Sequence, residues 1–344
     1  MVGSPQNEIT VLAVDCPPMT INPLPMNRSQ LIFYFLFSLL FSFYCDAQTK
    51  PTATLQVNPQ ALNFIVMGDW GRNGEDHQRE VATQMGKTAA EASVDFIIAT
   101  GDNFYPKGVI SEFDPHWKYS YEDIYTAFSL QWDWHPVLGN HDYGANPDAQ
   151  VAYSKISRRW QMPARYYSKK FILNDDTTQQ VLIAFIDTCP LIKGYYSGNG
   201  HAVHDQDSTA QKIWLEKLLS NPSPNIKWKI VVGHHPMYTG GSRTENHDVR
   251  SIRRSLQPMF DRYKVDAYLA GHEHSLQHIA GPNKSVNHFI SGAASERTPV
   301  RMLPASEFAV SEYGFMLFSA MPDKILVQVI DFKGSILYTT SIVK

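Results

Sequence analysis

The sequence predicts an α/β fold in which two mixed β-sheets pack on each other and are flanked by helices. First, the chain of 344 residues is 43% apolar, which is enough for a substantial core. Second, apolar residues 62–67, a helical pattern over 75–92 and apolar residues 94–99 give the order β-α-β, which favours parallel pairing. Third, the β-rich residues 287–342 contain no helical pattern, which suggests a second sheet packed on the first.

The chain begins with a segment that we expect to be removed. Met26 opens a typical export signal, whose apolar run over residues 31–44 is too short to span a membrane and ends near the small residue Ala47. Cleavage there makes Gln48 the first mature residue, so we expect a secreted or periplasmic protein with no stable membrane anchor. The alternative is an uncleaved anchor. Because residues 1–25 show no periodic pattern, we interpret Met26 as the true start.

Three segments follow from this division. Residues 1–47 form the extension and signal, residues 48–60 form a polar linker, and residues 61–344 form a single domain. Removal of the first segment leaves Cys189 as the last cysteine, which excludes an intrachain disulfide and favours a buried, unreactive thiol. The formal charge of −3 provides no positive field for nucleic acid, so no nucleic-acid partner is expected.

Five apolar runs in this domain share one feature: each ends at a glycine that polar side chains follow. The endings are Gly68-Asp69, Gly101-Asp102, Gly139-Asn140-His141, Gly233-His234-His235 and Gly271-His272-Glu273-His274. Ligands of open α/β sheets bind at the carboxyl ends of the strands, so these side chains are expected to converge on one crevice. Neighbouring residues of a strand alternate, so His235 is expected to face away from it.

The remaining elements follow the same two patterns. A strand is expected over 181–187 and a helix over 209–219. Four further strands are expected over 287–291, 314–319, 325–330 and 335–342.

The converging side chains suit a pair of metal ions. They include carboxylates (Asp69, Asp102), a phenol (Tyr105), an amide (Asn140) and imidazoles (His234, His272, His274). Each piece alone is weak evidence, because an Asp after a strand is usually a helix cap or a turn residue. The ordered occurrence of all five endings is what indicates a metal site.

These motifs resemble the metal-binding blocks of the purple acid phosphatases, most closely the small tartrate-resistant branch, over about residues 61–275. The blocks are Gly68-Asp69-Trp70-Gly71, Gly101-Asp102-Asn103-Phe104-Tyr105, Gly139-Asn140-His141-Asp142, Val232-Gly233-His234-His235-Pro236 and Gly271-His272-Glu273-His274. The resemblance implies the four-layer α/β/β/α sandwich of metallophosphoesterases for residues 61–344. The wider calcineurin-like family usually has a His where this chain has Gly71, and it lacks the tyrosine supplied here by Tyr105.

The resemblance also implies the metals. Asp69, Tyr105 and His274 would hold Fe(III), Asp102 would bridge, and Asn140, His234 and His272 would hold Fe(II), Zn(II) or Mn(II). A phenol, with a reference pKa near 10, binds as phenolate only to a strongly Lewis-acidic ion, which fits ferric iron. The alternative for Tyr105 is an aromatic packed beside Phe104.

The implied activity is that of a monomeric acid phosphatase, which hydrolyses small phosphate monoesters by attack of metal-bound hydroxide with an acid optimum. One alternative is a phosphodiesterase or nucleotide pyrophosphatase on the same metal core. Another is a phosphate-binding or metal-binding protein without turnover.

Two catalytic residues are implied outside the ligand set. His141 would orient substrate or protonate the leaving oxygen, the alternative being a structural His bonded to Asp142. Arg243 stands where animal members of the branch have a substrate-side His. Its guanidinium can clamp phosphate oxygens but cannot donate a proton near neutral pH; alternatively it is a solvated loop residue.

Overall fold

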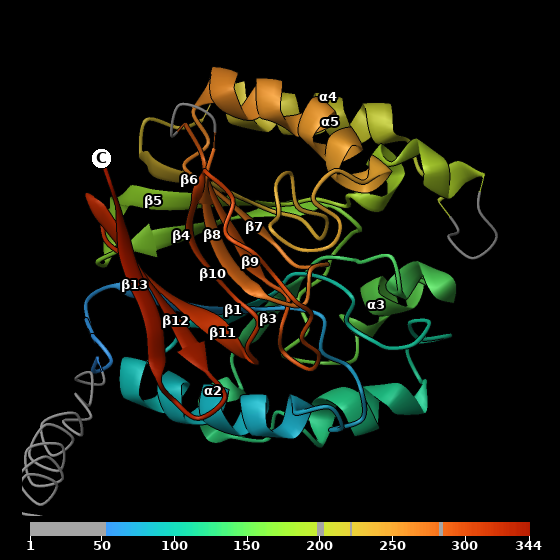
Figure 1. Ribbon diagram of the computed structural model, residues 1–344, viewed down its shortest axis with the longest axis horizontal. Helices are drawn as coiled ribbons and strands as arrows, with labels where there is room; N and C mark the ends of the chain where they lie inside the picture. Colours follow the sequence, from blue (N-terminus) through green and yellow to red (C-terminus); the bar gives the residue numbers. More distant parts are fainter. Residues whose placement is uncertain (1–52, 198–202, 221, 282–284) are drawn as a thin grey trace, which may run out of the picture. The chain divides into compact units, whose positions relative to one another are not determined.

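The protein consists of two β-sheets packed face to face, with helices on the outer face of each (Figure 1). It is known from a computed structural model that describes residues 53–197, 203–220, 222–281 and 285–344. The layers run helix, sheet, sheet, helix, which confirms the predicted fold class. Contacts of β1 with β4 and of β9 with β11 join the two sheets.

The first sheet has six strands in the order β13-β12-β11-β1-β2-β3. Its strands are β1 (Leu62–Met67), β2 (Phe96–Ala99), β3 (Asp133–Pro136), β11 (Gly314–Ala320), β12 (Lys324–Asp331) and β13 (Ile336–Val343). β1, β2 and β3 are parallel, because helix α2 (Gln78–Ala92) returns the chain from β1 to the start of β2. The parallel pairing expected from the β-α-β pattern is therefore present.

The second sheet has seven strands in the order β10-β8-β9-β7-β6-β5-β4. They are β4 (Tyr167–Leu173), β5 (Asp176–Phe185), β6 (Ile226–Val232), β7 (Ala267–Ala270), β8 (Leu276–Ala280), β9 (Asn287–Ser291) and β10 (Ser306–Val310). β5, β6, β7 and β9 run parallel, whereas β4, β8 and β10 pair antiparallel with their neighbours.

The expectation that the β-rich residues 287–342 form a second sheet is wrong for β11, β12 and β13, and right for β9. β11 pairs antiparallel with β1 and extends the first sheet, β12 and β13 continue it in turn, and β9 and β10 join the second sheet. The sequence pattern could not predict this division of the strands, because the residues of an apolar strand do not indicate which sheet edge it will pair with. The five strand endings consequently lie on two sheets and meet between them.

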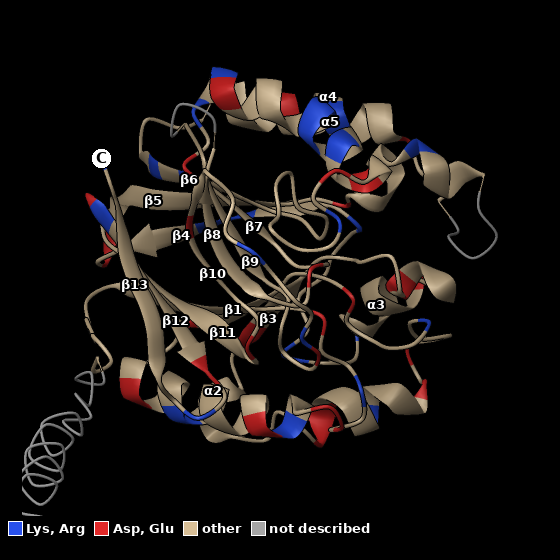
Figure 2. Cartoon of the chain, in the orientation of Figure 1, with Lys and Arg blue, Asp and Glu red and all other residues tan. Residues whose placement is uncertain are grey.

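Helices α4 (Ser208–Ser220) and α5 (His247–Tyr263) cover the outer face of the second sheet, and α3 (Asp148–Tyr153) follows β3. Leu215, Ile252 and Phe260 pack these helices against Val231 and Ala270 of the sheet. Helix α5 begins at an Asn246 cap, whose side chain accepts a hydrogen bond from the Val249 amide at 3.0 Å. Much of both sheets is uncharged (tan in Figure 2), and the charged residues on the strands include the partly exposed lysines of β4 and β6.

The predicted signal over 1–47 and residues 48–52 of the linker lie outside the described residues. Among those that are described, Cys189 is buried and free, as expected. No helix within the described ranges is long and apolar enough to cross a membrane.

Candidate metal centre

The polar side chains of the five strand endings lie just beyond the carboxyl ends of five strands, as expected. Asp69 follows β1, Asp102 follows β2, Asn140 follows β3, and the histidines follow β6 and β7. Asp69, Asp102 and His272 have left-handed backbones, with φ of 58°, 48° and 69°. Such conformations are uncommon outside glycine, but Asp and His adopt them more readily than most residues, and seven other non-glycine residues of the described ranges share them.

The first group of donor atoms surrounds the phenol oxygen of Tyr105. This oxygen lies 3.2 Å from each of three atoms: Asp69 Oδ1, Asp102 Oδ2 and His274 Nε2. His274 Nε2 is itself 3.4 Å from Asp69 Oδ1. The structure thus brings together the three residues expected to hold the ferric ion and the expected bridge.

The second group surrounds Nε2 of His234. This nitrogen lies 3.2 Å from Asn140 Oδ1, 3.2 Å from His272 Nδ1 and 3.3 Å from Asp102 Oδ2. Oδ2 of Asp102 is therefore the one carboxylate oxygen that both groups share.

The donor set fits cations. His234 Nδ1 is 2.9 Å from the carbonyl oxygen of Thr100, which can only accept, so the proton sits on Nδ1 and the lone pair of Nε2 faces the site. Its three neighbours also offer lone pairs. One ligand atom each of Asp69, Asp102 and His234 fall within 4.8 Å of one another. A positive charge between these groups satisfies all of them at once.

The pKa shifts of Asp102, His234 and Tyr105 also indicate that the site favours bound positive charge. Burial opposes ionisation of Asp102, but the neighbouring His234 and His141 hold its pKa well below the usual range. Burial also disfavours the charged imidazole of His234, yet the Asp102 carboxylate raises its pKa to about 9. Burial and the carboxylates of Asp102 and Asp69 raise the pKa of Tyr105 well above 10. Without cations the site must therefore hold protons on His234 and Tyr105.

A buried carboxylate joins two of the ligand-bearing loops. Asp142 accepts backbone N–H groups from Asn103 at 3.1 Å, Phe104 at 3.2 Å and Gly139 at 2.8 Å. Burial, reinforced by the charge of Asp102, raises the pKa of Asp142 to about 7. Gly139 is required here, because a Cβ at this position would lie 2.2 Å from Asp102 Oδ1.

His141 lies at the rim, with its side chain 39% exposed. Its Nδ1 is 2.7 Å from the carbonyl oxygen of Pro106, so Nδ1 carries a proton. Its Nε2 is 4.0 Å from Asp102 Oδ2, and its ring centroid is 4.5 Å from that of Tyr105. The side chain of His141 thus bonds to the Pro106 carbonyl and not to Asp142, which was the alternative considered. Asp142 instead accepts the three backbone N–H groups described above.

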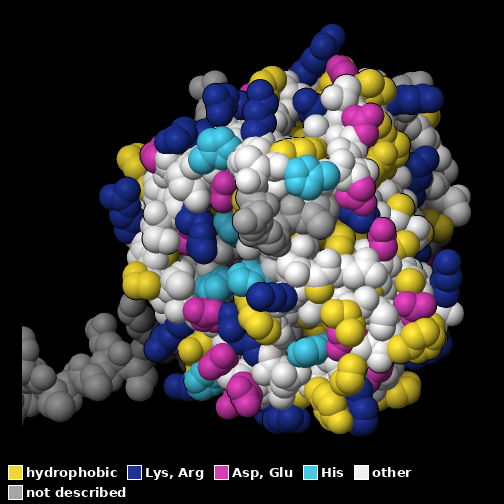
Figure 3. Space-filling model, turned by 90° about the vertical axis from the view of Figure 1, so that its right-hand side faces the viewer, with side chains coloured by type: hydrophobic (Ala, Val, Ile, Leu, Met, Phe, Trp, Pro, Cys, Tyr) yellow, Lys and Arg dark blue, Asp and Glu magenta, His cyan; other side chains and the backbone are white. Residues whose placement is uncertain are grey.

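Arg243 is attached to the backbone and side chain of the His-Glu-His block. Its Nη1 lies 3.3 Å from the carbonyl oxygen of His272 and 3.6 Å from Glu273 Oε1, and its side chain is 36% exposed. The side chain is therefore neither fully solvated nor remote from the ligands. On the face drawn in Figure 3, several histidine side chains (cyan) lie near Lys and Arg side chains (dark blue).

The expectation for His235 is wrong. Its ring packs 4.3 Å from that of His272 and 4.9 Å from that of His234. Strand β6 ends at Val232, so strict alternation does not extend to His235. Its Nδ1 and Nε2 lie 2.8 Å from Thr188 Oγ1 and 2.9 Å from the Tyr195 hydroxyl.

The fold and the motifs agree with the comparisons to known proteins. A family model described as calcineurin-like phosphoesterase matches residues 62–276. Purple acid phosphatase 17 of Arabidopsis thaliana is 36% identical over 270 residues, which cover 74% of this chain and 77% of that protein. Tartrate-resistant acid phosphatase type 5 of Homo sapiens is 34% identical over 249 residues, covering 70% of this chain and 74% of its own.

The chain belongs to the purple acid phosphatases. It is accordingly an enzyme that hydrolyses phosphate monoesters, and its donor set is that of a binuclear metal centre.

A solved structure shares this fold as well. GAP50, the anchor in the inner membrane complex of Plasmodium, superposes with a TM-score of 0.69 at 25% identity, covering 82% of this chain and 89% of its own.

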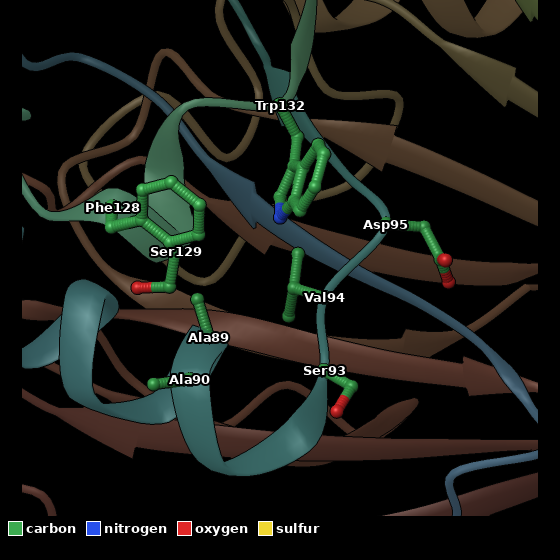
Figure 4. Close-up of a pocket in the computed structure, with 8 residues that line it drawn as sticks. All are labelled: Ala89, Ala90, Ser93, Val94, Asp95, Phe128, Ser129 and Trp132. Atoms are coloured by element: carbon green, nitrogen blue, oxygen red, sulfur yellow. The ribbon is translucent and has the colours of Figure 1, made fainter.

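An apolar pocket elsewhere on this purple acid phosphatase is separate from the metal centre. It is lined by Ala89 and Ala90 of α2, by Val94 and by the exposed rings of Phe128 and Trp132 (Figure 4). Val94 precedes β2, so the pocket lies at the amino end of a strand whose carboxyl end carries Asp102. It has no part in the site.

Two residues near the metal centre were missed by the sequence reasoning. Arg72 stacks on Tyr105, and Glu296 lies beside His274. Arg72 directly follows the first block, which was a usable signal, whereas Glu296 follows no strand ending of the recognised kind.

Proposed function

We propose that this purple acid phosphatase binds Fe(III) through Asp69, Tyr105 and His274. The divalent ion, Fe(II), Zn(II) or Mn(II), is held by Asn140, His234 and His272, and Asp102 serves both ions. The observation that carries this assignment is the phenol oxygen of Tyr105, which lies 3.2 Å from two carboxylates and an imidazole. A phenol in so anionic a setting favours a trivalent ion, which replaces its proton.

When bound, the two cations supply a nucleophile from water and neutralise charge on the phosphoryl group. Residues of the chain supply the proton for the leaving group and bind the phosphate oxygens. Nδ1 of His141 is engaged by the Pro106 carbonyl, so Nε2 is the atom that donates a proton to the leaving oxygen. Arg243, anchored by the His272 carbonyl, directs its remaining N–H groups at the phosphate oxygens.

The test is a visible absorption spectrum with metal analysis of the purified protein. An absorption band from phenolate-to-iron charge transfer is the expected result, with about one iron per chain if the divalent ion is Zn(II) or Mn(II) and about two if it is Fe(II). Tyr105→Phe is expected to lose the band, whereas the exposed Tyr119→Phe keeps it. A colourless, iron-free preparation that is fully active would falsify the ferric assignment.

The substrate class is tested by comparing two nitrophenyl esters. We expect much faster turnover of the phosphate monoester than of the bis-ester. The reverse order would favour the phosphodiesterase or nucleotide pyrophosphatase alternative. Phosphate binding without release from any ester would favour a binding protein.

We also propose that the enzyme acts outside the cytoplasm, because residues 26–47 have the pattern of a cleavable export signal. Sequencing of the mature amino terminus is expected to begin at Gln48. A mature chain that begins at Met1 would contradict both the signal and the assignment of Met26 as the start.

A further inference from the structure

An arginine stacks on the tyrosine of the metal centre. Cζ of Arg72 lies 3.8 Å from the centroid of the Tyr105 ring, and the arginine side chain is only 21% exposed. A guanidinium this close to an aromatic face is attracted by the ring electrons, and more strongly where water is excluded. Arg72 therefore places a permanent positive charge on the ring of a predicted ligand.

The position of Arg72 is fixed by the structure around it. Its Nε donates to Ser295 Oγ at 3.1 Å, and Ser295 Oγ donates to the carbonyl oxygen of Asp69 at 2.6 Å. Its Nη2 pairs with Oε2 of Glu296, and its Nη1 is 3.9 Å from Asp76 Oδ2. The guanidinium is thus tied to the loop that carries Asp69.

Glu296 connects the arginine to a second ligand. Its Oε2, the oxygen that pairs with Arg72, also lies 3.3 Å from Nδ1 of His274, within ion-pair distance but without the geometry of a hydrogen bond. The other nitrogen of His274 faces Asp69 and Tyr105. Histidines that bind metals commonly contact a carboxylate through the remote nitrogen, which fixes the ring orientation and makes the ligand a better electron donor.

We propose that Arg72 and Glu296 act as a pair of positioning residues that set the electronic character of the two ring ligands, Tyr105 and His274. This inference rests on the proposed function, in which Tyr105 binds as an anion. The charge of Arg72 stabilises electron density on the Tyr105 ring. Removing that charge makes the ring a better electron donor, so charge transfer from ring to iron costs less energy.

The decisive variant is Arg72→Gln. The charge-transfer band is expected to move to longer wavelength, and Arg72→Lys, which keeps the charge, should lie between the variant and the unmodified enzyme. Arg297→Gln is a matched control, because Arg297 lies 5.1 Å from the centroid of Tyr313 and 3.4 Å from Glu312 but contacts no predicted ligand. It should leave the band in place.

The role of Glu296 is tested by the rate at which a chelator removes iron. Glu296→Gln is expected to lose iron about 10-fold faster than Arg297→Gln, the usual scale for partners of metal ligands. Circular dichroism of each variant shows whether it is folded.

Two negative results are distinguishable. If the unmodified enzyme has no iron band, the proposed ferric centre fails. If the band is present, yet Arg72→Gln leaves its wavelength unchanged and Glu296→Gln retains iron normally, only the pair is refuted, and Arg72 with Glu296 is then an ordinary partly exposed ion pair.

Discussion

At the scale of single residues, the position of His141 leads to a prediction about leaving groups. His141→Asn removes the proposed proton donor, so turnover should fall by about 10²-fold or more for an alkyl phosphate, whose leaving oxygen needs a proton. The loss should be much smaller for a nitrophenyl phosphate, because nitrophenolate leaves unaided. Steady-state kinetics on both substrates measure the difference. Equal losses would show that His141 does not act as the acid.

Arg243 is expected to act through phosphate binding. Arg243→Gln should raise KM and the inhibition constant of inorganic phosphate by about 10-fold, the scale of one charge-assisted hydrogen bond. Arg250→Gln, on the exposed start of α5, is the control. Phosphate inhibition that is unchanged in Arg243→Gln would show that Arg243 only braces the His272-Glu273 segment.

At the scale of elements, Asp142 ties the loop after β2 to the loop after β3. Asp142→Ala leaves the buried amides of Asn103, Phe104 and Gly139 without this acceptor, so the free energy of unfolding should fall by about 2–5 kcal/mol. Urea unfolding measures this, with the exposed Glu91→Ala of α2 as a control. Metal retention should fall as well, because the Asp102 loop loses its support. A variant as stable as the Glu91 control would contradict this role.

The same elements show how far the sequence could predict the molecule. The convergence of the expected ligands was predictable, because their segments follow apolar strands at a glycine, and the carboxyl ends of parallel strands share an edge. The partition of strands between the two sheets was not predictable, because β11 to β13 are antiparallel and could extend the edge of either sheet. Strands β4, β8 and β10 and helix α5 were not anticipated. β4 and β10 are only partly buried, β8 follows closely on the His-Glu-His block, and Pro258 interrupts the pattern of α5.

The positions of Arg72 and Glu296 at the metal centre could not be predicted from the pattern of strands and glycines. Both are charged residues on loops; Arg72 at least follows the first block directly, whereas nothing in the local pattern distinguishes Glu296 from a solvated side chain. They reach the site only because the segment after β9 folds back on the loop after β1, where Ser295 binds the Asp69 carbonyl. Such contacts depend on the packing of both sheets and cannot be derived from one segment.

At the scale of the whole molecule, two buried imidazoles predict how stability varies with pH. Burial, with a contribution from Lys169, lowers the pKa of His135 to about 3, and burial together with His278 lowers that of His288 to about 3. In the unfolded chain both titrate near 6.5. Between these values the unfolded state binds more protons, so stability falls as the pH drops from about 6.5 toward 3. The slope is about 1.4 kcal/mol per pH unit for each imidazole.

This fall in the free energy of unfolding at low pH can be reduced by a substitution outside the metal centre. His135 packs against the rings of Phe96, Phe171 and Phe185, so His135→Phe keeps an aromatic side chain in an aromatic site. The free energy of unfolding in urea should then differ less between pH 7 and pH 4 than it does in the unmodified enzyme at equal metal content. His247→Phe, at a side chain 51% exposed, should not change that difference. If both variants show the same pH dependence as the parent, His135 is protonated in the folded protein and the acid sensitivity has another source.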